Sequence, residues 1–233
     1  MTTPDGLNRA ARRRLTKGLA RILGIGGIKG GIGKTTTAMF LALVYALLDF
    51  KVLVIDADPG SGTARKWYRE HKRRTRLHLL PFDVKVHTGD DLDDHITDEG
   101  WREEFDLIII DTGGDHERIL KAAARIADYM LLTCSPSPAD LMSLSDTARA
   151  AIDALSEAAE VRLLLVGVKS ERTMKNAKDE LRAAGLPVMA ATVPHSLKYQ
   201  AAVLQMPEKG LAYTRVQHEL DNPEESPKED TAA

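Results

Sequence analysis

A glycine-rich loop flanked by lysine and threonine is the segment of this chain best suited to chemistry. It runs from Lys29 to Thr36, between a short apolar stretch and a long apolar helical pattern. Glycines let backbone N–H groups surround a phosphate, and the following helix adds about half a positive charge at its N-terminus. We therefore expect Lys34 to contact the β and γ phosphates of ATP and the Thr35 hydroxyl to bind Mg²⁺. The predicted nucleotide-binding residues are Lys29, Gly30, Gly31, Ile32, Gly33, Lys34, Thr35 and Thr36.

Carboxylates follow two further apolar runs. Asp56 and Asp58 end the run that begins near Lys51, and Asp111 ends the run Leu-Ile-Ile-Ile. In an open parallel sheet the ligand lies outside the carboxyl ends of the strands, so these side chains should emerge on the side of the glycine-rich loop. An aspartate in the position of Asp111 often holds Mg²⁺ through a water molecule.

Strand and helix patterns alternate along the chain, which predicts an α/β fold. We expect a single-domain, doubly wound, mostly parallel twisted sheet with helices on both faces, the fold of P-loop nucleotidases. The predicted strands are 21–28, 51–57, 84–88, 107–111, 129–134, 161–168 and 188–192. The predicted helices are 34–48, 63–76, 116–127, 139–159, 173–184 and 197–205.

Composition limits the domain organisation and the class of protein. Residues 1–20 form a basic extension, residues 21–220 the predicted ATPase domain and residues 221–233 an acidic tail; both ends are expected to be mobile. The formal net charge of -2 excludes a strongly basic protein. The single cysteine, Cys134, cannot close an intrachain disulfide, and no export signal is recognisable, which favours a cytoplasmic location. The longest apolar run, Ala38 to Leu48, is about half of the roughly 20 residues that a membrane span needs.

These motifs together resemble the ParA/MinD family of P-loop ATPases, whose deviant phosphate loop has a Lys-Gly-Gly-x-Gly-Lys-Thr core. Lys29 to Thr35 match that core at every fixed position. Further similar segments are Asp56-x-Asp58-Pro59, the Asp111-Thr112 strand end, and Ala127-Asp128 leading to Pro136-Ser137-Pro138-x-Asp140. The last two look most like the small plasmid-partition branch. The resemblance covers roughly residues 21–210.

The resemblance implies an ATP-dependent homodimer that sandwiches two nucleotides. Lys29 would then reach the partner's ATP and stabilise charge that develops during phosphoryl transfer. By the same resemblance Asp58 would position the attacking water, Asp56 would support the Mg²⁺ shell and Asp111 would hold Mg²⁺ from outside its first shell. The alternative for Asp58 is a turn-forming residue before proline.

Three departures from the family pattern are visible. Gly113-Gly114 stands where many relatives have two prolines, Gly60 replaces a common glutamine, and Pro194-His195 stands where an arginine is expected near the last strand. The residues that contact adenine therefore stay unassigned.

Two cationic stripes could bind DNA phosphates without sequence preference. The predicted DNA-binding residues are Arg65, Arg69, Lys72, Arg73, Arg76, Lys175, Lys178 and Arg182. A solvated helix face is the alternative for each stripe.

The leading hypothesis is an ATP-dependent partition ATPase that is cytoplasmic and associated with the nucleoid. Its ATP-bound dimer would bind DNA, and a centromere-binding ParB-like adaptor would stimulate hydrolysis and release. One alternative is a ParA-like positioning ATPase for another cargo, such as an organelle, a conjugation complex or a chemotaxis complex. A MinD-type membrane ATPase would need a terminal amphipathic helix, which the acidic tail does not offer, so no membrane partner is expected.

Overall fold

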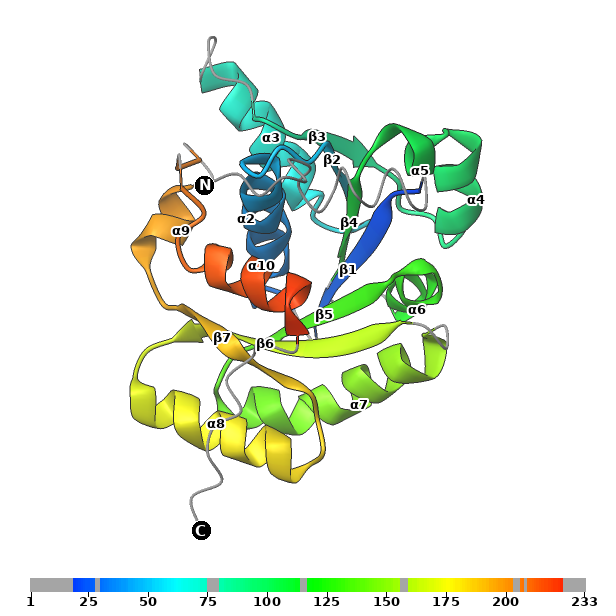
Figure 1. The fold of residues 1–233 in the computed structure, drawn as a ribbon. Helices are drawn as coiled ribbons and strands as arrows, with labels where there is room; N and C mark the ends of the chain where they lie inside the picture. Colours follow the sequence, from blue (N-terminus) through cyan, green and yellow to red (C-terminus); the bar gives the residue numbers. More distant parts are fainter. Residues whose placement is uncertain are drawn as a thin grey trace, which may run out of the picture.

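The centre of the molecule is one seven-stranded parallel sheet, seen in a computed structural model that describes residues 19–27, 30–74, 80–113, 117–155, 159–202, 206–207 and 209–223. The strands lie in the order β3-β2-β4-β1-β5-β6-β7 (Figure 1). Their bounds are β1 (Arg21–Gly27), β2 (Val52–Ala57), β3 (Asp83–Val86), β4 (Leu107–Thr112), β5 (Tyr129–Cys134), β6 (Glu160–Val168) and β7 (Val188–Pro194). The central strand β1 pairs with β4 on one side and β5 on the other, so the strand order reverses at β1. Ligands of such sheets bind at this reversal.

Helices cover both faces of the sheet. One face packs against α2 (Lys34–Ala46), α3 (Thr63–Arg74), α9 (Leu197–Ala201) and α10 (Tyr213–Asp221). The opposite face packs against α4 (Leu92–Asp98), α5 (Trp101–Glu104), α6 (Glu117–Ile126), α7 (Pro138–Ala154) and α8 (Glu171–Ala183). The structure thus confirms the doubly wound α/β fold.

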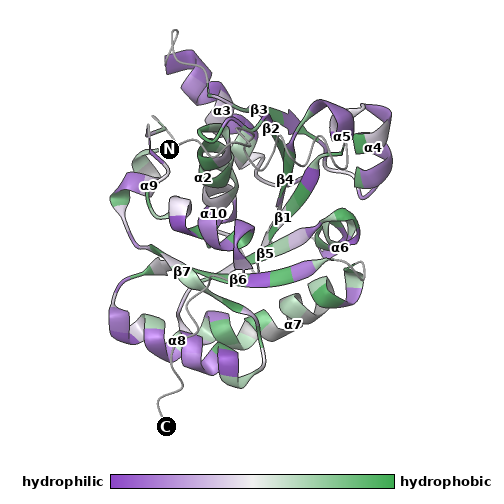
Figure 2. Cartoon of the chain, in the orientation of Figure 1, coloured by the Kyte–Doolittle hydropathy of each residue, from purple (hydrophilic) through white to green (hydrophobic). Residues whose placement is uncertain are grey.

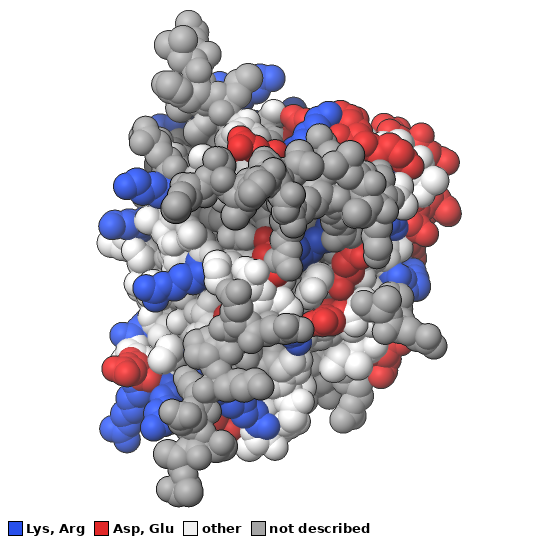
Figure 3. Space-filling view, in the orientation of Figure 1, with Lys and Arg blue, Asp and Glu red and all other residues white. Residues whose placement is uncertain are grey.

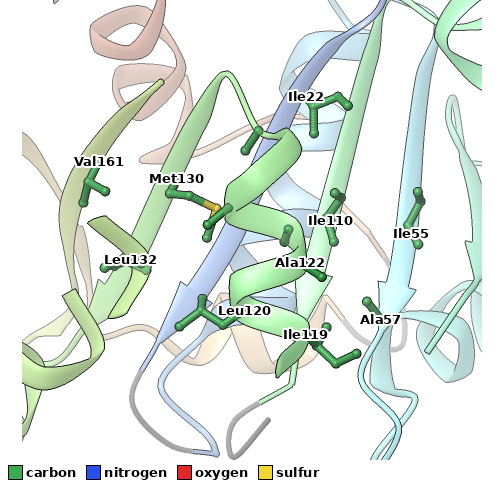
Figure 4. Close-up of a cluster of buried hydrophobic side chains, with 14 of the residues drawn as sticks. Ile22, Ile55, Ala57, Ile110, Ile119, Leu120, Ala122, Met130, Leu132 and Val161 are labelled. Carbon is green, nitrogen blue, oxygen red and sulfur yellow. The ribbon is translucent and has the colours of Figure 1, made fainter. Parts of the chain in front are cut away.

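Side chains of the central strands alternate between the two cores. In β4, Ile108 and Ile110 point to the α6 side, whereas Ile109 points to the α2 side, and all three are fully buried. Burial on both faces explains why the run is apolar throughout rather than alternating. Figure 4 shows the α6 side, where Leu120 and Ala122 of α6 lie over the strands. Figure 2 shows α2 largely hydrophobic and α8 largely hydrophilic, as a buried and a surface helix require.

All seven predicted strands are present, with shifts of one or two residues at their ends. The helix that follows β2 is described as far as Arg74, so the rest of its predicted span lies outside the described residues, as do residues 203–205 of the predicted helix 197–205. Sequence reasoning missed α4, α5 and α10.

Helix α10 belongs to the folded domain and not to the tail. Asp221, which the sequence places at the start of the acidic tail, accepts hydrogen bonds from Arg21 of β1 and from Tyr45 of α2. Glu219 accepts the backbone N–H groups of Ala190 and Ala191, both at 2.7 Å, on the edge strand β7. A carboxylate that occupies these donors protects the edge from pairing with another strand. Within the described part of the chain, no helix is long and apolar enough to cross a membrane.

Candidate functional site

The glycine-rich loop follows the end of β1 and leads directly into α2. Gly31 and Gly33 have φ angles of 79° and 84°, a left-handed conformation that costs glycine little. A Cβ on Gly27 would lie 2.5 Å from the Ile32 side chain and 2.9 Å from the carbonyl oxygen of Thr133. Glycine at position 27 therefore leaves room for the Ile32 side chain to pack against the end of β1, and this contact fixes the position of the loop. Lys29, predicted to act in catalysis, lies outside the described residues.

The first turn of α2 carries the predicted phosphate and metal contacts. Lys34 is buried, at 7% exposure, while Thr35 and Thr36 are half-buried. The first backbone hydrogen bond of the helix runs from Thr37 N to Gly33 O at 2.8 Å. Gly33 has no side chain that could cap the N–H groups of Lys34, Thr35 and Thr36, and such groups at a helix N-terminus favour an anion.

Asp56 and Asp111 lie side by side, because they are paired residues of the parallel strands β2 and β4. Their exposures are 0% and 1%. Burial raises the pKa of Asp111 to about 7; the nearby charge of Asp56 adds to this rise, while the Thr35 hydroxyl and Lys34 oppose it. Burial also raises the pKa of Asp56. The two strand ends that the sequence predicted to carry carboxylates therefore lie next to each other.

The residues around Asp111 fit a magnesium ion. Both carboxyl oxygens of Asp111 are buried without a well-formed hydrogen bond from the described residues. Such an unsatisfied carboxylate is costly unless a cation or a water molecule completes it. The described residues contain no cluster of three metal-binding side chains, so the remaining ligands of a cation here would be phosphate oxygens and water. Mg²⁺ bound to nucleotide phosphates is commonly held in this way.

Asp56 and Asp58 hold the loop that connects β2 to α3. Asp56 accepts the backbone N–H of Arg65 at 2.8 Å, in the first turn of α3, and the N–H of Asp58 at 3.3 Å. Asp58 accepts the N–H of Gly60 at 2.9 Å through Oδ1 and the Ser61 hydroxyl through Oδ2. Asp58 thus stabilises a turn before Pro59, as the alternative to a catalytic role predicts. Its side chain is half-buried in the loop that follows β2.

The predicted DNA-binding stripe on α3 is solvent-exposed where it is described. Arg65, Arg69, Lys72 and Arg73 are all exposed, and Arg76 lies outside the described residues. Arg73 and its neighbour Arg74, which the sequence analysis did not include, both donate to Glu70 and lower its pKa to about 2.

The predicted stripe on α8 is only partly exposed to solvent. Lys175 and Arg182 are exposed. Lys178, however, is 5% exposed and its ammonium donates to the carbonyl oxygen of Ala190 at 2.6 Å. Its side chain joins α8 to β7, so Lys178 is not available to a DNA phosphate. Figure 3 shows lysine and arginine side chains along the α8 and α9 side of the molecule and acidic side chains over α4 and α5.

Sequence reasoning also missed residues that support the loop from behind. The Thr112 hydroxyl donates to Ile25 O at 2.9 Å and ties β4 to β1 just before the loop. The Thr37 and Tyr213 hydroxyls lie 3.0 Å apart in a buried contact between α2 and α10. Hydroxyl contacts between distant segments leave no periodic pattern in a sequence, which is why neither contact was predicted.

A parallel sheet that reverses its strand order at β1, a left-handed glycine loop at that point and buried aspartates at the adjoining strand ends define a P-loop nucleotide-binding protein. The family model of the CobQ/CobB/MinD/ParA nucleotide binding domain matches residues 23–210. The chain belongs to this family.

The names of two similar curated proteins describe two cellular roles. "Maintenance of carboxysome distribution protein A" of Gloeobacter kilaueensis is 30% identical over 213 residues, which cover 86% of this chain and 94% of that protein. The chromosome partitioning protein ParA of Caulobacter vibrioides is 44% identical over 59 residues, covering 25% of this chain and 22% of ParA.

Solved structures share the fold. The cell division ATPase MinD of Pyrococcus furiosus superimposes with a TM-score of 0.68 at 18% identity, over 88% of this chain and 100% of MinD. An ATP complex of a McdA variant from Cyanothece gives 0.63 at 20% identity, over 87% and 96% of the two chains.

Proposed function

We propose that this chain is an ATP-driven positioning ATPase, whose ATP-bound dimer binds DNA and distributes a cargo complex along it. The observation that carries the proposal is the cluster of Lys34, Thr35 and Asp111 at the end of the central strands. One cation, one hydroxyl and one unsatisfied buried carboxyl are the groups that a magnesium-bound triphosphate requires.

The nucleotide would occupy the loop from Gly30 to Thr36. Lys34 would hold the β and γ phosphates, and Thr35 and Asp111 would hold Mg²⁺, with Asp56 supporting Asp111 from the next strand. When bound, the ion neutralises phosphate charge during phosphoryl transfer. Because Asp111 binds a cation best when ionised, ATP binding should be accompanied by loss of its proton.

Hydrolysis would depend on two further residues, Lys29 and Asp58. Lys29 would supply a positive charge to the nucleotide of the partner subunit, a contribution that makes ATP part of the dimer interface. Asp58 would orient the attacking water. Both of its oxygens accept hydrogen bonds within its own loop, so it must exchange the Ser61 hydroxyl for that water.

A hydrogen bond connects the nucleotide site to the proposed DNA-binding surface. Asp56 accepts the backbone N–H of Arg65, and Arg65 begins the exposed cationic stripe of α3. A change in charge at Asp56 or Asp111 therefore acts on the position of the α3 N-terminus. This contact supports DNA binding that depends on the bound nucleotide.

Positioning of a protein assembly is better supported than segregation of DNA. The similarity to the carboxysome distribution protein extends over most of both chains, whereas the similarity to the chromosome partitioning protein is limited to 59 residues. Segregation of a plasmid, prophage or chromosome with a ParB-like adaptor is the second candidate, which the 44% identity over that segment favours.

DNA retention measured with ATP, with ADP and without nucleotide, across a salt series, tests the proposal. We expect retention with ATP alone, and a steep loss as salt rises, because phosphate contacts dominate non-specific binding. Lys34→Ala should abolish nucleotide binding and with it this retention. Retention that is the same in all three nucleotide conditions would refute the ATP-gated switch.

The cargo is tested in the host cell. Deletion of the gene should cause protein assemblies to cluster while plasmid loss rates stay unchanged. A raised rate of plasmid or chromosome loss with normally distributed assemblies would instead select the segregation function.

A further inference from the structure

An exposed apolar surface lies at the start of α7. Pro138, Ala139 and Met142 are exposed there, and their spacing of three and four residues places them on one face of the helix. Met142 is 77% exposed, the highest value among the large apolar residues in the described part of the chain. Adjoining exposed apolar residues are typical of contact surfaces, and methionine is enriched in protein interfaces. We call these three residues the α7 apolar surface.

The turn before α7 holds this surface in place. The Ser137 hydroxyl caps the helix by accepting the backbone N–H of Asp140 at 3.3 Å, and Pro138 follows in the first turn, where its fixed φ suits a helix. Asp140 is 6% exposed, and its carboxylate accepts a hydrogen bond from the Ser135 hydroxyl. A surface that is ordered before it meets a partner loses little conformational entropy on binding. The α7 apolar surface is therefore well prepared for a contact.

The α7 apolar surface lies next to the nucleotide loop. Strands β1 and β5 are parallel neighbours, with Gly27 and Thr133 as register partners. The loop leaves β1 at Gly27, and α7 begins at Pro138, four residues after β5 ends at Cys134. Both segments therefore emerge from adjacent strands at the same end of the sheet. A second subunit that covers the loop from this end also lies against the start of α7.

The charge on the described surface favours a second copy of the chain as the partner. If Lys29 reaches the nucleotide of the other subunit, the loop lies close to the two-fold axis, where a surface meets its own copy. Residues 129–145 contain one charged side chain, the buried Asp140. By contrast, α3 carries six lysines and arginines against one glutamate, and residues 90–104 carry eight exposed acidic side chains, seen over α4 and α5 in Figure 3. Like charges repel across an interface, so the uncharged α7 apolar surface is the better one to meet itself.

We propose that the α7 apolar surface packs against a second copy of this chain in the ATP-bound dimer. The proposal rests on the proposed ATP-dependent dimer and names a protein contact that accompanies the shared nucleotides. A stable interface uses roughly 20–30 residues from each partner, and the α7 apolar surface is only a small part of that. It is therefore too small to hold two subunits together by itself. The contact forms when bound ATP adds its own contacts across the interface.

The test measures how fast an alkylating reagent reaches this surface in the full chain. One variant carries Met142→Cys, and the matched control carries Ile152→Cys, at a position near the other end of α7 that is 45% exposed. The native Cys134 is fully buried and does not compete for the reagent. Each variant is labelled with and without Mg²⁺ and a non-hydrolysable ATP analogue, at protein concentrations above and below those at which sedimentation detects dimers. We expect labelling at position 142 to slow by about tenfold or more in the dimer, because interface cores are packed like protein interiors, while labelling at position 152 stays unchanged.

Dilution separates the possible outcomes. Labelling at position 142 that stays slow after dimers are diluted apart would reflect a change within one chain and would overturn the proposal. Dimers in which position 142 is labelled at the rate of the monomer would also overturn it, because the contact would then lie elsewhere. If the unmodified chain forms no dimers with nucleotide, the proposed ATP-dependent dimer itself fails, and this contact fails with it.

A charged variant then measures what the contact contributes. Met142→Glu should bind nucleotide as the unmodified chain does and unfold at the same temperature, because an acidic side chain near a helix N-terminus is favourable. We expect it to dimerise about 100-fold more weakly, since each subunit would bury an unpaired charge. Met142→Leu, which keeps an apolar side chain, and Ile152→Glu should dimerise normally. Equal dimerisation of Met142→Glu and the unmodified chain would contradict the proposal.

Discussion

Asp56 and Asp111 are register partners on adjacent parallel strands, and both carboxyl groups are buried next to the first turn of α2. Two like charges in a desolvated place oppose each other's ionisation, so the pKa of Asp111 rises to about 7 and the pKa of Asp56 rises as well. Near neutral pH this pair therefore retains a proton, and we expect an incoming cation to displace it.

Binding of magnesium and ATP should release a proton and strengthen as pH rises. Between pH 6 and pH 8 the Asp111 carboxyl changes from mostly protonated to mostly ionised, and only the ionised form attracts Mg²⁺. Calorimetric titration with MgATP in buffers of different ionisation enthalpy measures the protons released. In Asp111→Asn we expect weaker binding and no pH-dependent proton release near pH 7. An equal proton release in this variant would assign the titration to another group.

The same carboxyl should make the ligand-free fold less stable at high pH. Asp111 has a folded-state pKa above its ordinary value, so its unfavourable contribution develops as pH rises from about 4 to 7 and is complete above pH 7. Asp111→Asn should therefore raise the free energy of unfolding at pH 8 by roughly 2–4 kcal/mol, and by much less at pH 4. Urea denaturation at the two pH values measures this difference. Asp83→Asn, at an exposed position of β3, is the control and should change neither value.

Lys29 is expected to act across the dimer. Lys29→Ala should leave ATP binding by the monomer intact, while it removes ATP-dependent dimerisation and lowers turnover by about 10³-fold or more, the range of a cation supplied in trans. Sedimentation with ATP and a phosphate-release assay measure the two effects. Lys51→Ala removes an exposed lysine that pairs with Glu104 and serves as the control. Normal turnover of the Lys29 variant would refute the sandwich arrangement.

The strands and the glycine-rich loop were predictable because their signals are local. An unbroken run such as Leu107 to Ile110 can only be satisfied inside a two-sided sheet, and the glycine-rich loop requires its own backbone conformation. The burial of Lys178 was not predictable, because its position on α8 fits an exposed stripe and only the bond to Ala190 of β7 draws it inward. Helices α4 and α5 are too short and acidic to show a clear apolar period.

The exposed arginines of α3 should contribute to DNA binding and to its salt dependence. Arg65→Ala with Arg69→Ala should lower affinity for non-specific duplex DNA in the presence of ATP, and reduce the slope of log K against log salt by up to about 2. Fluorescence anisotropy over a salt series measures both quantities. Lys121→Ala, on α6 across the sheet, is the matched control. If the slope is unchanged in the α3 variant, α3 is a solvated helix face and not a DNA contact.

Helix α10, which no sequence pattern indicated, should help to hold the first turns of α2. The Tyr213 and Thr37 hydroxyls are 3.0 Å apart and buried, and Thr37 lies one turn after Lys34. Tyr213→Phe leaves the Thr37 hydroxyl without this partner, so we expect the free energy of unfolding to fall by about 1–3 kcal/mol. Urea denaturation measures this loss, and hydrogen exchange should show faster opening of the α2 N-terminus. Tyr68→Phe, at a half-buried position of α3, is the control.

Thr37→Ala should lower the free energy of unfolding by an amount similar to that for Tyr213→Phe. The double variant should lose clearly less free energy than the sum of the two single losses, because the two residues form one contact. Strictly additive losses would show that the hydroxyls act independently and that α10 does not support the loop through this bond.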